Sequence, residues 1–559
     1  MTFYTSLRSP GGAVAIFKFM KYKFYIIAIL AAFFMLGCEK PEPDNGGQTE
    51  KVLTGYKELL EAYNAGKLYK EVQRVSDVNH VVFEDGSKIS VPVSSFQIHD
   101  HTTGLVPTVS VQAGMQWWTV GDQLTSVKVL PTNTPDVDAE PVYVYYDTAT
   151  LYMHLSNRNL IKFSSKTLEH EIDMARRQNI PTIYINTYGA GIYDKENYVD
   201  GTITIKDHEK LYSDVDNFTA TMGIRGRGNS TWSFPKKPYK VKLKEKASIF
   251  GMGADKEWAL LANYSDRTLM RNILAMKMSE ICGFSWTPHM YSVHVYLNSS
   301  YQGVYTLCEH KKVHKDRVDI DLDAGDVYLE IEQQQDETTC WWTGMGVPMM
   351  FSDPEVPSAE LYSEITKWFS DFEASLYSNY MADPDRGYAK YIDVDSFIDY
   401  YIVQEIAKNT DGNLRKSSFI TKKKGGKLEM YHLWDFDLTF GNTGWLSSPD
   451  GFYIKDYNPS CVPGDNWFNR MFTDPAFVKK VQKRWNELYP QFMALTDFID
   501  EQAYILDKAQ KENFKKWSIH EVVDWVGVPS QGSYEAEVKY LKEFYVDRLE
   551  WLNTEINKL

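Results

Sequence analysis

Three aspartates in the C-terminal half of the chain stand where they could do chemistry together. Asp411 lies in the polar run 409–413, directly after a segment with helical periodicity. Asp435 and Asp437, separated by one residue, lie just beyond two short β segments that return the chain to the same edge. Two such carboxylates can bind a divalent cation, and a third can orient a hydroxyl group and accept its proton. Taken alone, Asp435 and Asp437 could equally cap a turn.

A glycine-rich stretch earlier in the chain could bind phosphate. Residues 223–232 contain Arg225-Gly226-Arg227-Gly228 and lead into residues 239–244, which alternate basic and apolar side chains and so predict a strand with one basic face. Glycines let backbone N–H groups approach phosphate oxygens, and Lys240 or Lys242 could reach the same phosphates. Glycines also serve ordinary turns, and a lysine face is usually solvated. Protein kinases use a phosphate loop, a lysine strand, a catalytic Asp and metal-binding carboxylates in this order, and the order favours a nucleotide site.

These residues need helices and hairpins to bring them together. We expect Asp266 to cap a helix whose buried side carries Leu269, Ile273 and Met276. Asp395 should cap a second helix, which ends before Asp411. Hairpins are predicted over 291–307 and 417–434.

The N-terminus has the features of an export signal. Lysines precede an apolar run of thirteen residues, from Phe24 to Leu36, which is shorter than the roughly 20 residues that a membrane-spanning helix needs. The run ends in Met35-Leu36-Gly37-Cys38, which resembles the bacterial lipobox, in which the peptidase cuts before the Cys and the thiol carries a lipid. The alternative is a buried strand followed by an idle Cys. We therefore expect a signal peptide over 1–38, lipidation of Cys38, and a protein held in the cell envelope, at the outer membrane or cell surface.

The remaining chain divides into segments that differ in composition and in hydrophobic periodicity. The polar, Pro- and Gly-containing segment 39–55 predicts a flexible tether. We expect a helix over 56–75, a small all-β module over 76–165, a larger mixed unit over 166–480, and helices over 481–559 that belong to that unit.

Composition excludes some classes of function. The chain has 60 Lys plus Arg against 75 Asp plus Glu, so a nucleic-acid partner is not expected. The cysteines other than Cys38 show no metal-ligand spacing. Residues 319–330 nearly follow a calcium loop, but the glycine stands one position too late and strands are expected on both sides.

The ordered motifs resemble the CotH kinase family, named for spore-coat proteins. The resemblance covers roughly 174–559 and is carried by Arg225 to Trp232 with Pro235 to Tyr239, by Asp266 to Asn272, and by Trp434 to Gly441. It implies an α+β fold, with an atypical protein-kinase-like two-lobed domain and C-terminal helices after the small all-β module. It also implies that ATP and Mg²⁺ or Mn²⁺ are used to phosphorylate protein Ser or Thr.

The resemblance also assigns roles to individual residues. Asp411 would be the catalytic carboxylate, and Asp435 the main metal ligand with Asp437 assisting. Arg225, Gly226, Arg227 and Gly228 would form the nucleotide loop, Lys240 or Lys242 would meet the α- and β-phosphates, and Glu309 would lie where the lobes join.

The sequence departs from the kinase pattern at one place. A kinase catalytic loop has a metal-binding Asn about five residues after its Asp, whereas Lys416 stands there, and Asn413 could substitute. A catalytically inactive, adhesin-like surface protein on the same scaffold is therefore the alternative. A carbohydrate-active enzyme is a third reading, but side chains two residues apart do not give glycosidase spacing. The protein substrate or surface ligand is not specified by the sequence.

Overall fold

The computed structural model describes residues 46–76, 78–92, 99–100, 107–112, 115–120, 123–131, 138–146, 150–164, 175–212, 217–335, 339–456, 466–519 and 527–559. The chain divides into two units, Met1–Lys51 and Val52–Leu559. The predicted signal peptide and Cys38 lie outside the described residues. None of the described helices combines the length and apolar character needed to cross a bilayer.

The first helix differs from the prediction at both ends. Helix α1 spans Gly46–Asn64, so it begins inside the predicted tether and ends well before residue 75. Gly66 follows it with φ +70°, a backbone conformation that favours glycine and ends the helix. Residues 69–75, predicted as helix, instead form strand β1 (Tyr69–Val75), because they pair in register with β2 (Val78–Phe83). Tertiary pairing has here overridden a local helical pattern.

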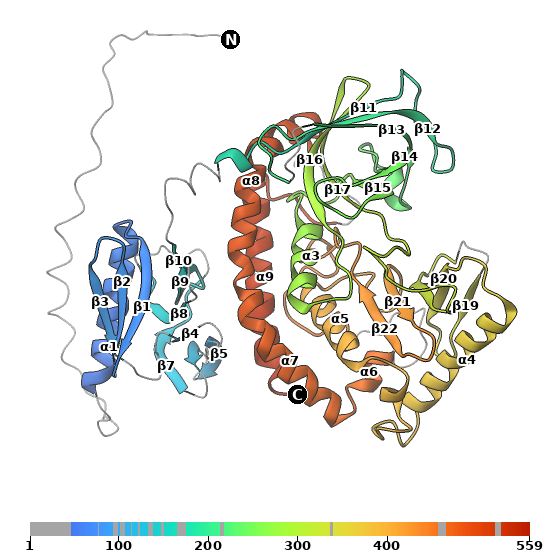
Figure 1. Ribbon diagram of the computed structural model, residues 1–559. Coiled ribbons are helices and arrows are strands. Elements are labelled where there is room, and N and C mark those ends of the chain that lie inside the picture. Colours follow the sequence, from blue (N-terminus) through green and yellow to red (C-terminus); the bar gives the residue numbers. More distant parts are fainter. Residues whose placement is uncertain are drawn as a thin grey trace, which may run out of the picture. The chain divides into compact units, whose positions relative to one another are not determined.

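Strands follow up to residue 164, as the sequence predicts (Figure 1). They form three small sheets, ordered β1-β2-β3, β10-β9-β8-β4 and β5-β6-β7. The remaining bounds are β3 (Lys88–Pro92), β4 (His99–Asp100), β5 (Pro107–Gln112), β6 (Met115–Val120), β7 (Gln123–Lys128), β8 (Pro141–Tyr146), β9 (Thr150–Leu155) and β10 (Leu160–Ser164).

A closed seven-stranded barrel, ordered β11-β12-β13-β14-β15-β17-β16, comes next. Its strands are β11 (Thr182–Asn186), β12 (Val199–Lys206), β13 (Asn217–Gly226), β14 (Tyr239–Ala247), β15 (Asp255–Leu261), β16 (Met290–Leu297) and β17 (Ser300–Glu309). The predicted alternation in β14 is confirmed: Tyr239, Val241 and Leu243 are buried in the barrel core and the lysines between them point outward. Parallel pairing of β11 with β16 closes the barrel, so that no strand edge is left unpaired.

The second large sheet has the order β19-β20-β18-β21-β22. Its strands are β18 (Val327–Ile331), β19 (Cys340–Trp342), β20 (Pro348–Asp353), β21 (Ser418–Lys422) and β22 (Leu428–His432). The helices are α3 (Arg271–Cys282), α4 (Ala359–Leu376), α5 (Val394–Ala407), α6 (Trp467–Met471), α7 (Pro475–Met493), α8 (Leu495–Lys516) and α9 (Tyr534–Ile556), with the short 3₁₀ helices η2 (Ser230–Ser233) and η3 (Tyr388–Lys390). The fold therefore mixes helices and strands in several small sheets.

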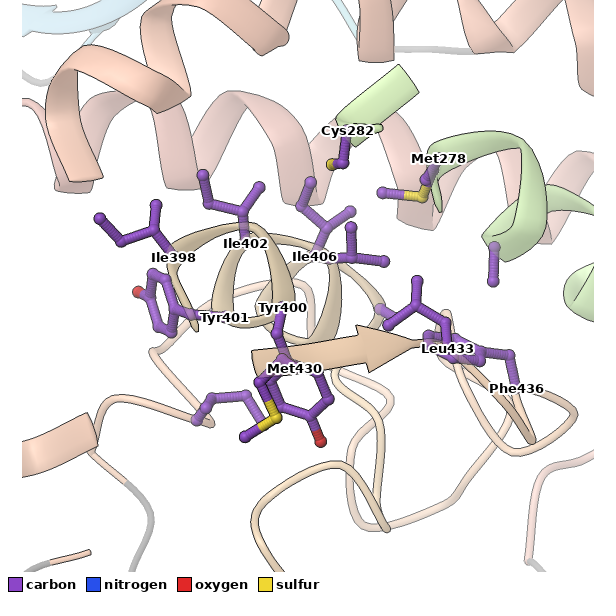
Figure 2. Packing of buried hydrophobic residues seen from close by; sticks show 14 of the residues in the cluster. Met278, Cys282, Ile398, Tyr400, Tyr401, Ile402, Ile406, Met430, Leu433 and Phe436 are labelled. Atoms are coloured by element: carbon purple, nitrogen blue, oxygen red, sulfur yellow. The ribbon is translucent and has the colours of Figure 1, made fainter. Parts of the chain in front are cut away.

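Helix α5 is central to the largest hydrophobic core. Apolar side chains occupy most of its circumference, as expected of a helix that is buried on all sides. In Figure 2, Ile402 and Ile406 project from α5 toward the side of Cys282 and Met278 of α3, and Tyr400 lies on the opposite side of the helix with Met430 of β22. The same helix and strand lead directly into the loops that carry Asp411 and Asp435, so this core fixes the places where those loops begin.

Two predicted helix caps are displaced. Helix α3 begins at Arg271 rather than after Asp266, whose carboxylate instead accepts the backbone N–H groups of Thr268 at 2.9 Å and Arg271 at 2.8 Å. The cap of α5 is Asp393, which accepts the N–H of Ser396 at 2.9 Å, and Asp395 lies in the first turn. In both cases the pattern placed the helix correctly but could not decide between neighbouring polar residues.

Candidate active site

The predicted catalytic and phosphate-loop segments meet around one cavity of about 210 Å³. Its wall is built from the β13–β14 loop, the segment after β15, the start of α3, the end of β18, and the loops after α5 and β22. The charged side chains that line it are Arg227, Lys236, Lys311, Glu330, Glu332, Asp411, Lys416, Asp435 and Asp437.

All three predicted aspartates line this cavity. Asp411 is 9 % exposed, Asp437 is half-buried and Asp435 is exposed to the cavity. Asp435 has φ +67°, an unusual conformation for a residue other than glycine, and Ser417 Oγ donates to its Oδ2 at 3.4 Å. Strained backbone of this kind concentrates at functional sites.

Two of these carboxyl groups, those of Asp411 and Asp437, have a raised pKa. Although Asp437 is only half-buried as a residue, desolvation of its carboxyl group raises its pKa well above the usual range, and the nearby Asp435, Asp266 and Asp411 act in the same direction. Burial also raises the pKa of Asp411, although Lys416 acts in the opposite direction. A cation at this place would relieve the repulsion, since it favours the ionised carboxylates.

The loop after β22 is held by the first two residues of α3. Asn272 Oδ1 accepts the backbone N–H of Phe436 at 2.7 Å, and Arg271 Nε donates to the carbonyl of Thr439 at 3.0 Å. Asn442 Nδ2 donates to the carbonyl of Asp437 at 2.7 Å. The sequence pattern included Arg271 and Asn272 among its motifs, but their task is to position the acidic loop.

The Asp411 loop is fixed by close packing beneath it. A Cβ on Gly412 would lie 2.2 Å from Gln404 Oε1, so any larger residue there would require the buried Gln404 side chain to shift. The N–H of Lys416 donates to the carbonyl of Asp411 at 3.2 Å, which folds the loop back on itself. Lys416 Nζ then lies 3.4 Å from Asp411 Oδ2.

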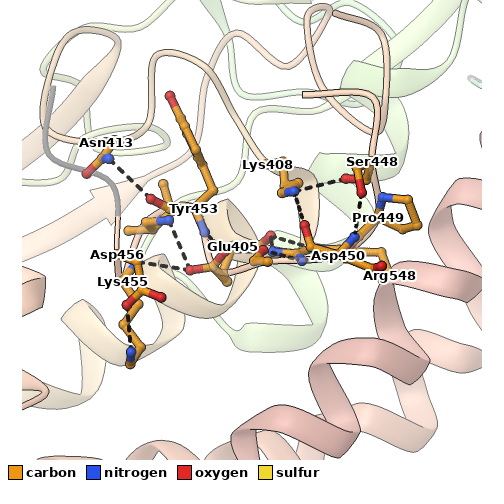
Figure 3. Close-up of polar contacts among 12 residues, drawn as sticks. Glu405, Lys408, Asn413, Ser448, Pro449, Asp450, Tyr453, Lys455, Asp456 and Arg548 are labelled. Atoms are coloured by element: carbon orange, nitrogen blue, oxygen red, sulfur yellow. Dashed lines mark hydrogen bonds and ion pairs between the residues drawn. The ribbon is translucent and has the colours of Figure 1, made fainter. Parts of the chain in front are cut away.

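A buried ion pair anchors the end of α5 just before that loop (Figure 3). Glu405 pairs with Arg548 of α9, with Nη2 2.6 Å from Oε1, and both side chains are almost completely buried. The Glu405 carboxylate also accepts the N–H groups of Tyr453, Ile454 and Lys455, at 2.6, 3.0 and 3.0 Å. These contacts join α5, α9 and the loop after the acidic motif into one scaffold.

Asn413, the predicted substitute metal ligand, does not line the cavity. Its Oδ1 accepts a hydrogen bond from Asn466 Nδ2 at 2.9 Å, and its Nδ2 donates to the carbonyl of Tyr453 at 3.4 Å. The side chain is buried and holds the loops together. The structure thus places it in the scaffold rather than with the aspartates.

The glycine-rich loop contributes two of its four predicted residues. Gly228, with φ +81°, and Arg227 line the cavity. The Arg227 guanidinium lies over the Trp434 ring, 5.7 Å from its centroid, and has no hydrogen bond or ion pair within the described part of the chain. It is therefore free to meet an anion.

The other two residues of the loop have structural tasks. Gly226 packs where a Cβ would lie 2.5 Å from the Trp232 ring. Arg225 faces away from the cavity, stacks on Tyr198 at 5.0 Å and donates to the carbonyl of Lys195.

The predicted strand lysines do not line the cavity. Lys240 and Lys242 both pair with Glu257, at 2.9 and 3.4 Å. Glu309 is buried at the end of β17 and accepts the N–H of His289 at 3.1 Å. The cavity lysines are instead Lys236, Lys311 and Lys416, none of which the sequence pattern singled out as a phosphate contact.

These cavity lysines differ in how far protein groups already engage their ammonium groups. Lys236 is buried and donates to the carbonyl of Val304 and to Asn513. Lys311, just after β17, pairs with Glu330 of β18 and keeps its Nζ 4.2 Å from the centroid of Phe419. Glu330 thus lies in strand β18 and pairs with a lysine. This does not fit the role of a calcium ligand at the end of a loop.

A family model for CotH kinase protein matches residues 224–552, more than half of the chain. This chain belongs to the CotH kinase family. The matched range runs from β13 into α9 and includes every residue that lines the cavity. The search of curated proteins gave no match.

The cavity of this CotH family member offers donors suited to a hard cation. Asp435 and Asp437 supply carboxylate oxygens, the ligands that Mg²⁺ prefers, and Mg²⁺ needs only one or two protein carboxylates beside phosphate and water. No group of three or more His, Cys, Asp and Glu side chains within the described ranges is arranged to hold a metal by itself. The residues therefore fit a cation that binds together with a phosphate ligand.

Proposed function

We propose that this CotH family member transfers the γ-phosphate of ATP to Ser or Thr of a protein, with Mg²⁺ or Mn²⁺ bound. The observation that carries the proposal is the meeting, in one cavity, of three aspartates and a glycine loop with an unpaired arginine. The barrel on one side and the five-stranded sheet with its helices on the other would correspond to the two lobes of a kinase-like fold.

The phosphate groups would lie against the β13–β14 loop. The positive φ of Gly228 lets its backbone approach a phosphate closely, and Arg227 can donate two parallel hydrogen bonds to phosphate oxygens. Asp435 and Asp437 would hold the divalent cation, which neutralises charge on the phosphate oxygens when bound.

Asp411 would act on the acceptor hydroxyl. Its carboxylate orients the hydroxyl oxygen toward the γ-phosphorus, the bond to the β–γ bridging oxygen breaks, and ADP leaves. The hydroxyl proton passes to Asp411 late in the step. Burial raises the pKa of this carboxyl, which makes it a better proton acceptor than a solvated aspartate.

We also propose that the protein is lipid-anchored through Cys38 in the cell envelope, on the strength of the residues from Lys18 to Cys38. Two acyl chains give stable membrane attachment, whereas one is marginal. In a Cys38→Ser variant, fatty-acid label should be absent from the protein. A variant that still carries the label would contradict the lipobox assignment.

The test of catalysis separates two aspartates by their tasks. Asp435→Ala should abolish both phosphate transfer and metal-dependent ATP binding, because the cation loses its main ligand. Asp411→Asn should abolish transfer but leave ATP and Mn²⁺ bound, since the change keeps size and hydrogen bonding. The measurements are phosphate incorporation from labelled ATP and calorimetric ATP binding with Mn²⁺. Asp319→Ala, at an exposed carboxylate outside the cavity, is the matched control.

The alternative is a surface binding protein without catalysis, and the lysine at the place of the kinase Asn favours it. Wild-type protein that binds ATP but shows no transfer that either substitution alters would support this alternative. Wild-type protein that binds no nucleotide with Mg²⁺ or Mn²⁺ would contradict the kinase proposal altogether.

A further inference from the structure

Lys416 lies five residues after Asp411, where the catalytic loop of a protein kinase carries an Asn that binds a second Mg²⁺. The ammonium is directed at the catalytic carboxylate, with Nζ 3.4 Å from Asp411 Oδ2. The Lys416 side chain lines the cavity and is 34 % exposed, so the charge remains within reach of a ligand there.

The loop holds Lys416 in this position from both sides. Its own N–H donates to the carbonyl of Asp411 at 3.2 Å, which brings the lysine back to the aspartate. The next residue, Ser417, has φ +52° and donates from Oγ to Asp435 Oδ2 at 3.4 Å. Lys416 contacts Asp411, and its neighbour Ser417 contacts Asp435. The backbone at Lys416 is therefore held from both sides.

The amide oxygens of Asn413 and Asn272 are already in use. The Oδ1 of Asn413 accepts from Asn466 and that side chain lies outside the cavity. Asn272 lines the cavity, but its Oδ1 accepts the N–H of Phe436 at 2.7 Å. Of the other cavity carboxylates, Glu330 pairs with Lys311 and Glu332 accepts the N–H of Gln334 at 2.9 Å. Asp435 and Asp437 are left for a cation, and two protein carboxylates suit one ion that also binds phosphate.

We infer that Lys416 supplies, as a fixed ammonium group on the nucleotide phosphates, the positive charge that a second divalent cation gives in two-metal kinases. The site then takes one divalent ion for each nucleotide. This inference rests on the proposed function, since it needs ATP in the cavity. It makes Lys416 a phosphate-binding residue that Asp411 orients, and it explains why the missing Asn need not mean an inactive site.

The experiment counts ions rather than turnover. Mn²⁺ and a non-hydrolysable ATP analogue are brought to equilibrium across a dialysis membrane, and the ions and nucleotides retained by the protein are counted. Wild-type protein should retain one Mn²⁺ per nucleotide, and Lys416→Asn should retain two because it restores the kinase ligand. Lys416→Ala should retain one, with affinity for the analogue about tenfold weaker, as for the loss of one charge-assisted hydrogen bond. Lys423→Asn, at the exposed tip of the β21–β22 hairpin, should behave as wild type.

The possible failures are distinguishable. Wild-type protein that retains two ions per nucleotide overturns the inference and leaves the proposed function standing. A Lys416→Asn protein that retains one ion and binds the analogue with unchanged affinity also overturns the inference alone. Wild-type protein that retains no nucleotide overturns the proposed function and the inference together.

Discussion

The cavity has an acidic wall, formed by Asp411, Asp435 and Asp437, and a basic wall, formed by Arg227 and the cavity lysines. The sequence predicted the residues of the acidic wall better than those of the basic wall. On the acidic wall, Asp411, Asp435 and Asp437 all line the cavity. Of the residues predicted to bind phosphate, only Arg227 and Gly228 line it, while Lys240 and Lys242 pair with Glu257. The acidic residues follow directly from the ends of a helix and a hairpin, and short side chains stay where the backbone puts them. Lysine side chains are long, and the alternation of a strand tells which face they take but not which partner they meet.

The largest expected effect breaks the scaffold of the acidic wall. Glu405→Ala leaves Arg548 buried without its carboxylate and removes the acceptor of three backbone N–H groups. Loss of one partner from a buried ion pair costs about 3–5 kcal/mol, so the free energy of unfolding should fall by that amount. Denaturant unfolding measures it.

Glu364→Ala is the matched control for this substitution. Glu364 pairs with Lys424 at 2.6 Å, but both side chains are exposed, and such pairs contribute about 0–1 kcal/mol. Equal losses for Glu405→Ala and Glu364→Ala would show that the Glu405–Arg548 contact does not stabilise the catalytic loop.

The second expected effect concerns which lysines bind the phosphates of ATP. Lys311→Met removes a cavity lysine and should weaken metal-dependent ATP binding about tenfold, because a charge-assisted contact is lost. Lys240→Met should leave the dissociation constant for ATP nearly unchanged, since Lys240 lies outside the cavity and Glu257 keeps Lys242 as a partner. Calorimetric titration of the two proteins measures the difference. The opposite ranking would return the phosphate contact to the strand lysine that the sequence suggested.

The same contrast explains how much of the fold the sequence could predict. The barrel hairpin over β16 and β17, the hairpin over β21 and β22, and helix α9 follow from local periodicity and turn residues, and the structure confirms them. Contacts between distant segments do not leave such a pattern. Asn413 is bonded to Asn466, 53 positions along the chain, and nothing in the loop around Asn413 indicates that partner.

The missed residues have the same physical origin. Lys311 follows β17 of the barrel, and its partner at the cavity is Glu330 of β18 in the other sheet, a contact that no local pattern indicates. The C-terminal part of the helix predicted over 56–75 is a related case, because residues 69–75 form β1 through their pairing with β2. A chain segment of mixed propensity takes the structure that its tertiary partner selects.

The smallest expected effect concerns Lys408, at the end of α5, and its contribution to the pH dependence of the free energy of unfolding. Lys408 follows α5 and donates from Nζ to the carbonyl of Ser448 at 2.9 Å and to that of Asp450 (Figure 3). Burial and the neighbouring Arg548 lower its pKa from 10.5 to about 8. Between these two values the unfolded chain binds more protons at Lys408 than the folded chain does. Its contribution therefore makes the free energy of unfolding rise with pH across this window, and the rise is absent below about pH 8.

Lys408→Met should remove that contribution. The difference in unfolding free energy between wild type and variant should grow in favour of wild type from about pH 8 to pH 10, because only wild type has the titrating group. Urea unfolding of both proteins at several pH values measures it, and the comparison cancels the titration of tyrosines that the two proteins share. Lys423→Met, at an exposed lysine, should run parallel to wild type. If Lys408→Met also runs parallel, the ammonium of Lys408 is as well solvated in the folded protein as in the unfolded chain. The end of α5 would then be open to water, and the acidic wall would be less rigidly supported than its contacts with Glu405 and Arg548 imply.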